Sequence, residues 1–412
     1  MSYKLYHIFI FIFILFVAQS TVAQSVLKID AVYDHEIGFE IDLNTASTLN
    51  NAMLNASGFL DDDLKNENLN RLNGINRGGS YSDIKLFYRQ DRKELWGVKN
   101  LGFYFAFELH RMDDYRFTDD LYKLVFYGNK QFAGQKADLA KSGSQSISYY
   151  QLKAGLQRKS INKKHRYGAN IALNIGRRFN YFQFNDPSYI YTDPKGTQIN
   201  LQMNASFRQS DTSNTEWYQV PGIGASVDLF YEFRKKDHYS ILFSIENLGI
   251  IHWDNNTILF DEDQQLNFSG IEVDNIFDMP NPLIQSSDTL MDYLYLHSSQ
   301  KGQRIMIPAD LKLQYQQYFL SRKILASALV HYRLFSYALP LYQLDATYKI
   351  NSHIKLGPIL SYGGYTAFNA GLKFELNFAK NYNIRLESRY ITGFAQHSFS
   401  GIGGFINFTY KI

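Results

Sequence analysis

An apolar side chain stands at every second position in many segments of this chain. In 101–110, Leu and Phe alternate with Gly, Tyr, Ala, Glu and His, and the same pattern runs through 167–176, 223–233 and 368–378. Successive side chains of a β-strand point to opposite faces. Each segment is therefore predicted to be a strand with one apolar face and one polar or small face.

Two architectures use such strands. A soluble sandwich buries the apolar face in a core, whereas a membrane barrel turns that face toward lipid and keeps the polar face in its lumen. The segments run about ten residues or more, the length that a tilted strand needs to cross a bilayer, while strands of soluble proteins average about five or six. Their polar faces carry charges of both signs. These features favour the barrel.

The first residues have the layout of a secretory signal peptide. Lys4 gives a positive start, 8–18 is an unbroken apolar run, and Thr21 and Ala23 are small residues that follow it. The alternative is a transmembrane helix, which needs about 20 apolar residues, more than this run supplies. We predict a signal peptide over 1–23, cleaved near Ala23, and no transmembrane helix in the mature chain.

Turn signals divide the remaining residues, 24–412, into strands of one all-β domain. The predicted strands are 28–44, 81–90, 98–110, 145–157, 166–178, 222–234, 239–250, 308–319, 324–336, 341–350, 354–363, 366–378, 383–393 and 401–412. Short polar turns alternate with long segments at 111–144, 179–221 and 251–307, as the periplasmic turns and extracellular loops of outer-membrane barrels do. The sequence predicts an antiparallel transmembrane outer-membrane β-barrel of about 14 strands, with small helical segments in the lumen or loops.

Three residues at special positions refine this picture. Trp96 and Trp253 fall at predicted strand ends, where an aromatic girdle lies, although aromatic residues also favour strands in general. Pro358 lies inside a predicted strand and indicates either a bulge or a different register there.

Residues 45–79 differ from the rest because they are rich in Asn and carry Leu at loosely helical spacing. A barrel of 14 strands is wide enough to need a water column or a plug. We interpret this segment as a candidate plug or lid, and the alternative is a plain surface loop.

Alternation along the strands also assigns charged side chains to the lumen. An Arg or Lys that faced lipid at mid-depth would cost about 2–4 kcal/mol. The candidate lumen-lining residues are Lys85, Arg89, Glu108, Lys153, Asp228, Glu232, Glu246, Lys373, Glu375, Arg385, Glu387 and Arg389. They indicate either a wetted path for a polar solute or a lattice of internal salt bridges that fills and stiffens the barrel.

Enzyme chemistry finds little support. The chain has no Cys, which excludes a thiol nucleophile and a Cys-bound zinc site, and its His residues are scattered. The acidic runs 61–63 and 261–263 lack the spacing of a known calcium loop. A formal net charge of only +3 gives no basic field for nucleic acid. We predict no catalytic residues, no metal site and no cofactor.

Two blocks carry a resemblance to a known family. The first is 120–129 (DLYKLVFYGN) with 132–135 (FAGQ), and the second is 244–253 (SIENLGIIHW) with 268–271 (FSGI). They resemble an uncharacterised family of outer-membrane barrels from Bacteroidetes-type bacteria, a domain of unknown function that is similar in layout to long-chain fatty-acid transporter barrels. No Asn-Pro-Ala step follows the first strand. The resemblance implies a fold and a location, with no catalytic residues to carry over.

The leading functional hypothesis is a passive channel or porin-like uptake barrel in the outer membrane of a Gram-negative cell. The alternative is a structural or assembly barrel with a plugged lumen, which would serve as a scaffold for surface or secretion complexes. The expected partners are outer-membrane lipid and the barrel-insertion machinery, with a small solute or a surface protein as a further partner and no nucleic acid.

Overall fold

A computed structural model gives the fold of the chain. It describes residues 35–50, 62–196, 198–211, 219–235, 238–269, 298–378, 381–391 and 400–412. The predicted signal peptide, residues 28–34 of the first predicted strand and 51–61 of the candidate plug lie outside the described residues. Among the described residues, no helix is both long and apolar enough to cross a membrane.

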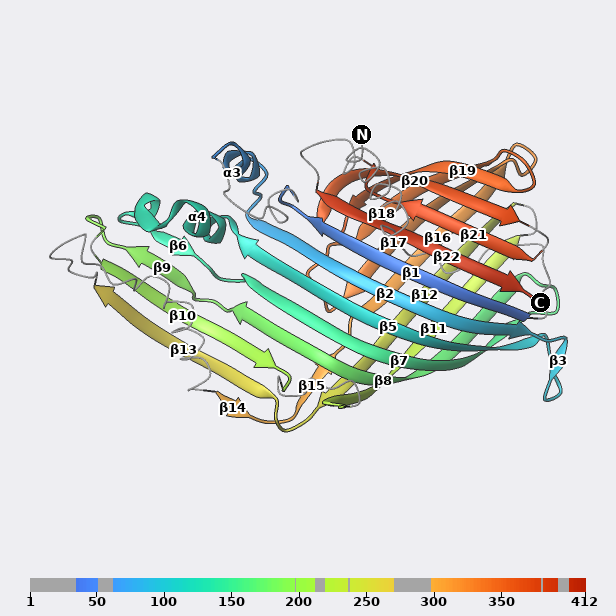
Figure 1. Cartoon of the computed structure of the whole chain (residues 1–412), viewed down its shortest axis with the longest axis horizontal. Coiled ribbons are helices and arrows are strands. Elements are labelled where there is room, and N and C mark those ends of the chain that lie inside the picture. The colour runs from blue at the N-terminus through green and yellow to red at the C-terminus, as the bar shows by residue number, and fades with distance from the viewer. Residues whose placement is uncertain are drawn as a thin grey trace, which may run out of the picture.

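Fourteen antiparallel strands close into a barrel (Figure 1). In their order around the wall they are β1 (His35–Ser47), β2 (Ile75–Asp91), β5 (Leu101–Thr118), β7 (Gly143–Lys159), β8 (His165–Phe184), β11 (Gly222–Lys235), β12 (Tyr239–Trp253), β16 (Ala309–Phe319), β17 (Ile324–Leu334), β18 (Leu341–Lys349), β19 (Ile354–Gly363), β20 (Thr366–Phe378), β21 (Tyr382–Ser388) and β22 (Gly401–Lys411). The last strand pairs with the first, from Glu36↔Lys411 to Ala46↔Gly401, and this pairing completes the wall. The predicted fold class is confirmed.

The wall has the two faces that the alternation predicted. Its outward face exposes large apolar side chains all around the barrel, among them Leu86, Phe105, Ile171, Leu344 and Phe368. Apolar surface in water is disfavoured by about 25 cal/mol per Å², and lipid removes that cost. The chain is thus a transmembrane β-barrel, the closed form in which strands satisfy their backbone groups inside a bilayer.

The apolar belt ends at a defined level on β5. Its outward side chains are apolar up to Leu109, after which Arg111 and Asp113 form an exposed ion pair with Nε and Oδ2 2.8 Å apart. The remaining part of β5, up to Thr118, therefore stands outside the membrane. Strand β8, which lies beyond β7 in the wall, likewise reaches Phe184, so parts of the segments predicted as long loops are continuations of wall strands.

Short turns gather at one end of the barrel, on the right in Figure 1, and we call it the periplasmic end because short turns face the periplasm in outer-membrane barrels. The connections at 320–323 and 350–353 are tight, and only the β2–β5 connection adds a small hairpin among the described turns. This hairpin consists of β3 (Glu94–Leu95) and β4 (Val98–Lys99).

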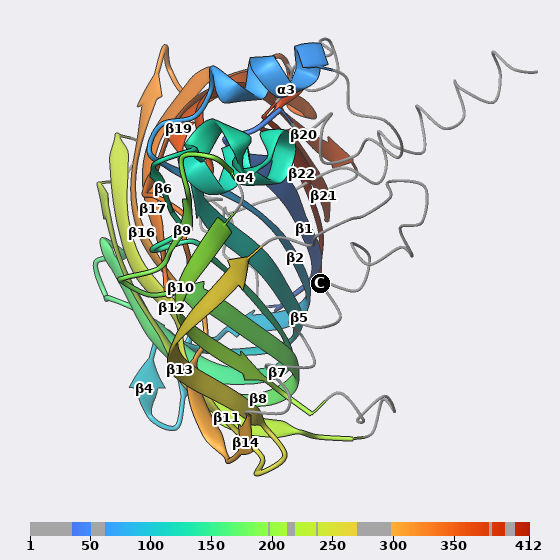
Figure 2. The same cartoon turned by 90° about the vertical axis from the view of Figure 1, so that its left-hand side faces the viewer.

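The opposite, extracellular end carries additional elements. They are α3 (Asp62–Leu69), α4 (Asp119–Tyr127), the 3₁₀ turn η1 (Asn129–Phe132), β6 (Lys136–Asp138), β9 (Tyr189–Thr192), β10 (Gln198–Gln209), β13 (Ile258–Ser269), β14 (Ser299–Gln300) and β15 (Gln303–Met306). Strand β10 pairs with the outer end of β8 and along its whole length with β13, so the sheet extends beyond the barrel (Figures 1 and 2).

The described part of the candidate plug lies at this extracellular rim. Helix α3 packs on α4, where the Tyr122 hydroxyl donates to the Lys65 carbonyl at 3.0 Å and the Tyr127 hydroxyl to Asn66 Oδ1 at 2.9 Å. Both helices stand side by side at the top of Figure 2. A role of 45–79 as a lid stays a prediction.

Candidate functional site in the barrel interior

The structure places the predicted lumen-lining side chains on the inner face of the wall. They come from β2, β5, β7, β11, β12, β20 and β21, except for Arg389, which directly follows β21, and none of them is exposed. They are Lys85, Arg89, Glu108, Lys153, Asp228, Glu232, Glu246, Lys373, Glu375, Arg385, Glu387 and Arg389. The alternation of the strands puts them there because every second side chain points inward.

Lys153 is at the centre of the largest group of these charges. Its Nζ lies 2.8 Å from Asp228 Oδ2 and 3.3 Å from Glu108 Oε2, and it donates to Asn247 Oδ1 at 3.1 Å. Nearby, Lys85 pairs with Glu40 at 3.0 Å. Each of these two cations thus has carboxylate partners on other wall strands, as buried charges require.

Further ion pairs line the inner face of the wall along β12, β16 and β18 to β21. Lys312 Nζ lies 2.6 Å from Glu246 Oε2, and Lys355 Nζ lies 2.9 Å from Glu375 Oε1. Lys373 bridges Asp345 and Glu387, at 3.1 and 3.6 Å. Four predicted residues, Glu246, Lys373, Glu375 and Glu387, thus form ion pairs, and the pair of Glu246 with Lys312 joins positions 66 residues apart.

These charges leave little open space between them. The cavity at the Lys153 group has a volume of about 70 Å³, enough for several water molecules and too small for a solute of appreciable size. A second cavity of about 20 Å³ lies beside Asp83, His110 and Arg333. Between the described residues, both of these spaces are far smaller than an open pore.

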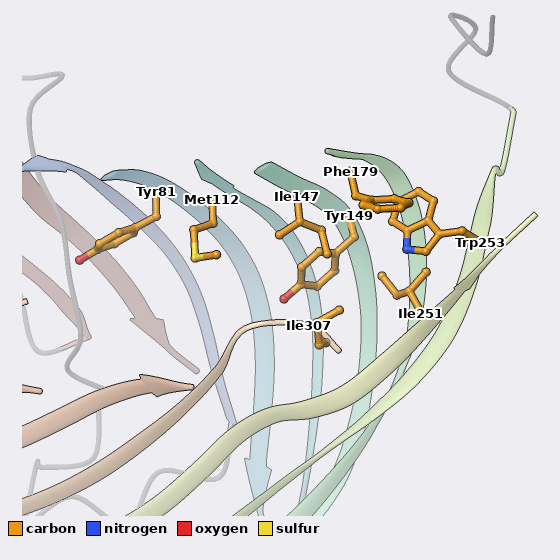
Figure 3. Packing of buried hydrophobic residues seen from close by; sticks show 8 residues of the cluster. All are labelled: Tyr81, Met112, Ile147, Tyr149, Phe179, Ile251, Trp253 and Ile307. Atoms are coloured by element: carbon orange, nitrogen blue, oxygen red, sulfur yellow. The ribbon is translucent and has the colours of Figure 1, made fainter. Parts of the chain in front are cut away.

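An apolar layer occupies the interior nearer the extracellular end (Figure 3). It consists of Tyr81, Met112, Ile147, Tyr149, Phe179, Ile251, Trp253 and Ile307. These side chains come from five wall strands and from the segment before β16, and Trp253 packs on Phe179 with ring centroids 4.8 Å apart. Trp253 has no exposed surface, so it does not belong to an aromatic girdle.

A bulge in β12 turns Trp253 inward. Asn247 has a φ of 60°, and the register between β11 and β12 shifts at the same level. Before the bulge Leu242 faces the interior, and after it Ile251 and Trp253 do. The backbone amide of Asn247 donates to Asp228 Oδ1 at 2.8 Å. The carboxylate that pairs with Lys153 therefore also holds the bulge.

Contacts across the lumen close the interior beside this layer. Strands β17 and β2 are separated by β18 to β22 and β1, which puts them on opposite sides of the barrel. Arg333 on β17 stacks on the Tyr81 ring of β2 at 4.4 Å and forms an ion pair with Asp310 at 2.8 Å. It also lies 3.7 Å from Asp83 on β2. The Tyr81 hydroxyl accepts a hydrogen bond from Arg389 at 3.0 Å.

Above this bridge, the loop 335–340 between β17 and β18 folds into the mouth of the barrel. The Tyr337 amide donates to Asp114 Oδ2 at 2.6 Å, and Gln145 donates to the Phe335 carbonyl at 3.0 Å. The Arg116 guanidinium stacks on the Tyr337 ring at 4.5 Å. Since Asp114, Arg116 and Gln145 belong to β5 and β7, this inward loop spans the lumen from wall to wall.

Asp114 is the buried acid of this contact. Its exposed fraction is 2 %, and it lies beyond the apolar belt. Burial raises the pKa of the Asp114 carboxyl from 3.8 to about 6, although donors from Tyr337, Gln145 and Tyr365 and the charge of Arg333 act in the opposite direction. The acid that anchors the inward loop therefore changes charge near neutral pH.

An apolar cleft of about 340 Å³ opens at the extracellular rim beside the inward loop. It is lined by Leu49, Tyr115, Arg116, Phe117, Leu121, Tyr122, Val125, Phe126, Ser142, Gly143, Ser144, Phe182 and Phe184. Helix α4 supplies one wall, and its Thr118 cap accepts a hydrogen bond from Leu121 N, which fixes the start of the helix. Arg116 is common to the cleft and to the contact with Tyr337.

Residues 37–382 match the model of a family described as a family of unknown function (DUF5723). The chain belongs to this family. The inferred resemblance to an uncharacterised barrel family is confirmed. No curated protein matches the chain.

Solved structures similar to this DUF5723 protein share about a tenth of its sequence. A TodX ΔS2S3 mutant monoaromatic hydrocarbon channel is 12 % identical, with 93 % of this chain and 91 % of that chain covered and a TM-score of 0.48. The P. putida toluene transporter TodX is 11 % identical over 93 % and 91 %, with a TM-score of 0.42. A Pseudomonas aeruginosa FadL homologue is 11 % identical over 92 % and 89 %, with a TM-score of 0.39.

Sequence reasoning missed the residues of this DUF5723 protein that close the mouth. Asp114 and Arg116 fell in a segment predicted as loop, and extending the alternation of β5 past His110 would have placed both on the inner face. Arg333 was on a predicted strand, two residues after the inward His331, but was not singled out. No pattern in 335–340 signals that Tyr337 crosses the lumen.

Proposed function

We propose that the protein is a gated outer-membrane channel that takes up a small solute, and that the closed state is the one described here. The inward loop 335–340 carries this proposal. It blocks the mouth but belongs to no wall strand, so it can leave while every strand pairing of the barrel stays intact. A barrel that served only as a scaffold would need no blocking loop that is separate from its wall.

The described contacts that join the loop to the opposite wall are polar, whereas Ala338 packs on the apolar cluster of Ala46, Tyr365 and Tyr390. One amide hydrogen bond to Asp114, one hydrogen bond from Gln145 and the Arg116 stack on Tyr337 join it to the opposite wall. Single contacts of these kinds contribute about 0.5–3 kcal/mol each. Their sum is within the range of an equilibrium between two conformations that a solute or a change of pH can shift.

The apolar cleft is linked to the loop through one side chain. Tyr115 and Phe182 line the cleft on the face of the sheet opposite to Asp114, which faces the inward loop. Arg116 lines the cleft and holds Tyr337. A solute that enters the cleft would compete for Arg116 and thereby loosen the loop, and the lining favours a solute with an apolar part.

A scaffold is the second candidate. Two observations favour it: the interior charges are neutralised by ion pairs, and β10 and β13 extend the sheet beyond the barrel as a surface for other proteins. For both candidates we propose that the mature chain, released by cleavage near Ala23, resides in the outer membrane after assembly by the insertion machinery.

Planar-bilayer recordings separate the two candidates. The refolded mature protein is compared with a variant that carries Arg116→Ala and Tyr337→Gly, which removes the cation–π contact between loop and wall and leaves the backbone hydrogen bonds. Lys136→Ala is the matched control, because it removes a similar cation–π contact, 3.7 Å from the Tyr189 ring, in the extracellular sheet. The channel proposal expects rare openings of the wild type and the control and frequent openings of the double variant. Silence of all three would sink it and favour the scaffold.

A further inference from the structure

The β3–β4 hairpin leaves the barrel sideways. Figure 1 shows it at the periplasmic end, and Figure 2, viewed along the barrel from the extracellular end, shows β4 outside the outline of the wall. The hairpin joins β2 to β5 through two short strands, with Glu94 opposite Lys99 and Leu95 opposite Val98. It therefore extends in the plane of the membrane at the level of the periplasmic surface.

The tip residue of this hairpin is not the one that the turn prefers. Trp96 and Gly97 form the two-residue turn with φ values of 51° and 76°. Asn or Asp followed by Gly is the favoured pair for such a turn, since both positions need a positive φ. A bulky residue at a positive φ is an outlier that points to a function outside the turn itself. Trp96 is also 79 % exposed, so packing within the protein does not explain it.

Cations flank this tryptophan. Arg92, Lys93 and Lys99 are all exposed, and the one acid within the hairpin is Glu94. Among the residues that the structure describes, none of the three cations has a carboxylate within ion-pair distance. The hairpin thus presents an exposed indole beside a net positive charge.

The next periplasmic turn around the rim repeats the combination. In the β7–β8 turn, Ile161 is 80 % exposed and is followed by the exposed Lys163 and Lys164. Strand β7 lies beside β5, so the turn and the hairpin are neighbours on the rim. An apolar tip with adjacent cations matches the boundary between acyl chains and anionic headgroups.

We propose that the β3–β4 hairpin binds anionic phospholipid headgroups in the periplasmic leaflet of the membrane. Trp96 lies at the boundary between headgroups and acyl chains, and Arg92, Lys93 and Lys99 contact the phosphates. Lipid fits better than a periplasmic protein because the hairpin extends along the membrane surface, where lipid covers the outside of the wall. Tryptophan is the residue type enriched at this level of bilayers.

Quenching of tryptophan fluorescence by brominated lipids tests the proposal on the whole mature protein. The chain has three Trp residues. The third is Trp217, and the Trp217→Phe variant keeps only Trp96 and Trp253. Because Trp253 faces the interior without exposed surface, Trp96 is then the one that lipid can reach. The protein is refolded in vesicles that contain brominated phosphatidylglycerol or brominated phosphatidylcholine. A change of its gel mobility on heating verifies that it has folded. Adding Trp96→Phe to the Trp217→Phe variant gives the part of the quenching that does not come from the hairpin.

The proposal expects quenching of Trp96 to show a ratio of binding strengths, phosphatidylglycerol over phosphatidylcholine, of about five or more. This is the preference that one cation confers near an anionic surface. Replacing Arg92, Lys93 and Lys99 by Gln should bring the ratio to about 1, and replacing Lys163 and Lys164 should lower it less. Equal quenching by both lipids in the parent protein would overturn the anionic preference. Absence of quenching by either lipid would place the tip in water and overturn lipid binding altogether.

Discussion

The backbone amide of Tyr337 donates a hydrogen bond of 2.6 Å to the carboxylate of Asp114 from across the barrel. Asp114 is on β5, and the loop with Tyr337 follows β17. Five wall strands separate β5 from β17 in one direction around the barrel, namely β7, β8, β11, β12 and β16, and seven separate them in the other direction. A contact of this kind cannot be part of the wall. It closes the mouth of the barrel, and the proposed gate depends on it.

Acidification should favour the closed state. Burial raises the pKa of Asp114 to about 6 in the closed protein, whereas a hydrated Asp114 in an open mouth would titrate near its ordinary value of about 3.9. The closed state therefore binds the proton more tightly, and its advantage is full below pH 3.8 and lost as the pH rises through 6. We expect the open probability in bilayers to fall by roughly tenfold between pH 7.5 and pH 5, and by at most roughly a hundredfold at still lower pH.

Asp114→Asn is the control for this pH dependence. The amide is isosteric, keeps an acceptor for the Tyr337 amide and does not titrate. The variant should therefore remain as closed at pH 7.5 as the wild type is at low pH. An unchanged pH profile in the Asn variant would assign the effect to another group.

Loss of the central cation should destabilise the barrel. Lys153→Met leaves Glu108 and Asp228 buried without their shared partner, and breaking a buried pair costs about 3–5 kcal/mol. The free energy of unfolding by urea in lipid vesicles measures this loss. Lys123→Met is the comparison, since Lys123 pairs with Asp120 at 3.4 Å on the partly exposed surface of α4, where such a pair contributes about 0–1 kcal/mol. Equal losses in both variants would contradict the role assigned to Lys153.

Two glycines make room for Trp253. A Cβ at Gly176 would lie 2.7 Å from its Cη2 atom, and one at Gly222 would lie 2.8 Å from its Cε3 atom. We expect Gly176→Ala to lower the free energy of unfolding by about 1–3 kcal/mol, the usual cost of overpacking. Ala225→Val, which adds two methyl groups on the lipid-facing side of β11, should have little effect. A Gly176→Ala variant as stable as the wild type would show that the apolar layer is loosely packed.

The wall of the barrel could be predicted from the sequence because every strand repeats one simple constraint, apolar toward lipid and polar toward the interior. The same rule found the charges around Lys153. The rule failed where a bulge interrupts the alternation of faces along a strand. The bulge at Asn247 reverses the faces of β12, so Trp253 points inward although its position at a strand end suggested a girdle.

Other differences come from contacts that no local pattern encodes. Pro358 produces no bulge: the register is continuous from Asp345↔Ile359 to Tyr348↔Leu356, and the ladder only skips the pairs beside the missing N–H. The inward turn of 335–340 depends on partners on β7 and β5, about 190 and 220 residues earlier in the chain. A period of two residues carries no information on such a contact.

A cysteine pair at Asp114 and Tyr337 tests the gate most directly. The natural chain has no Cys, so Asp114→Cys with Tyr337→Cys introduces the only two thiols, at positions that are already in contact. Conductance of the refolded variant is recorded in one bilayer under oxidising and then reducing conditions. The gate predicts a silent protein when the disulfide closes the mouth and openings that appear on reduction and disappear on reoxidation. Conductance that is the same in both conditions, or silence in both, would contradict it.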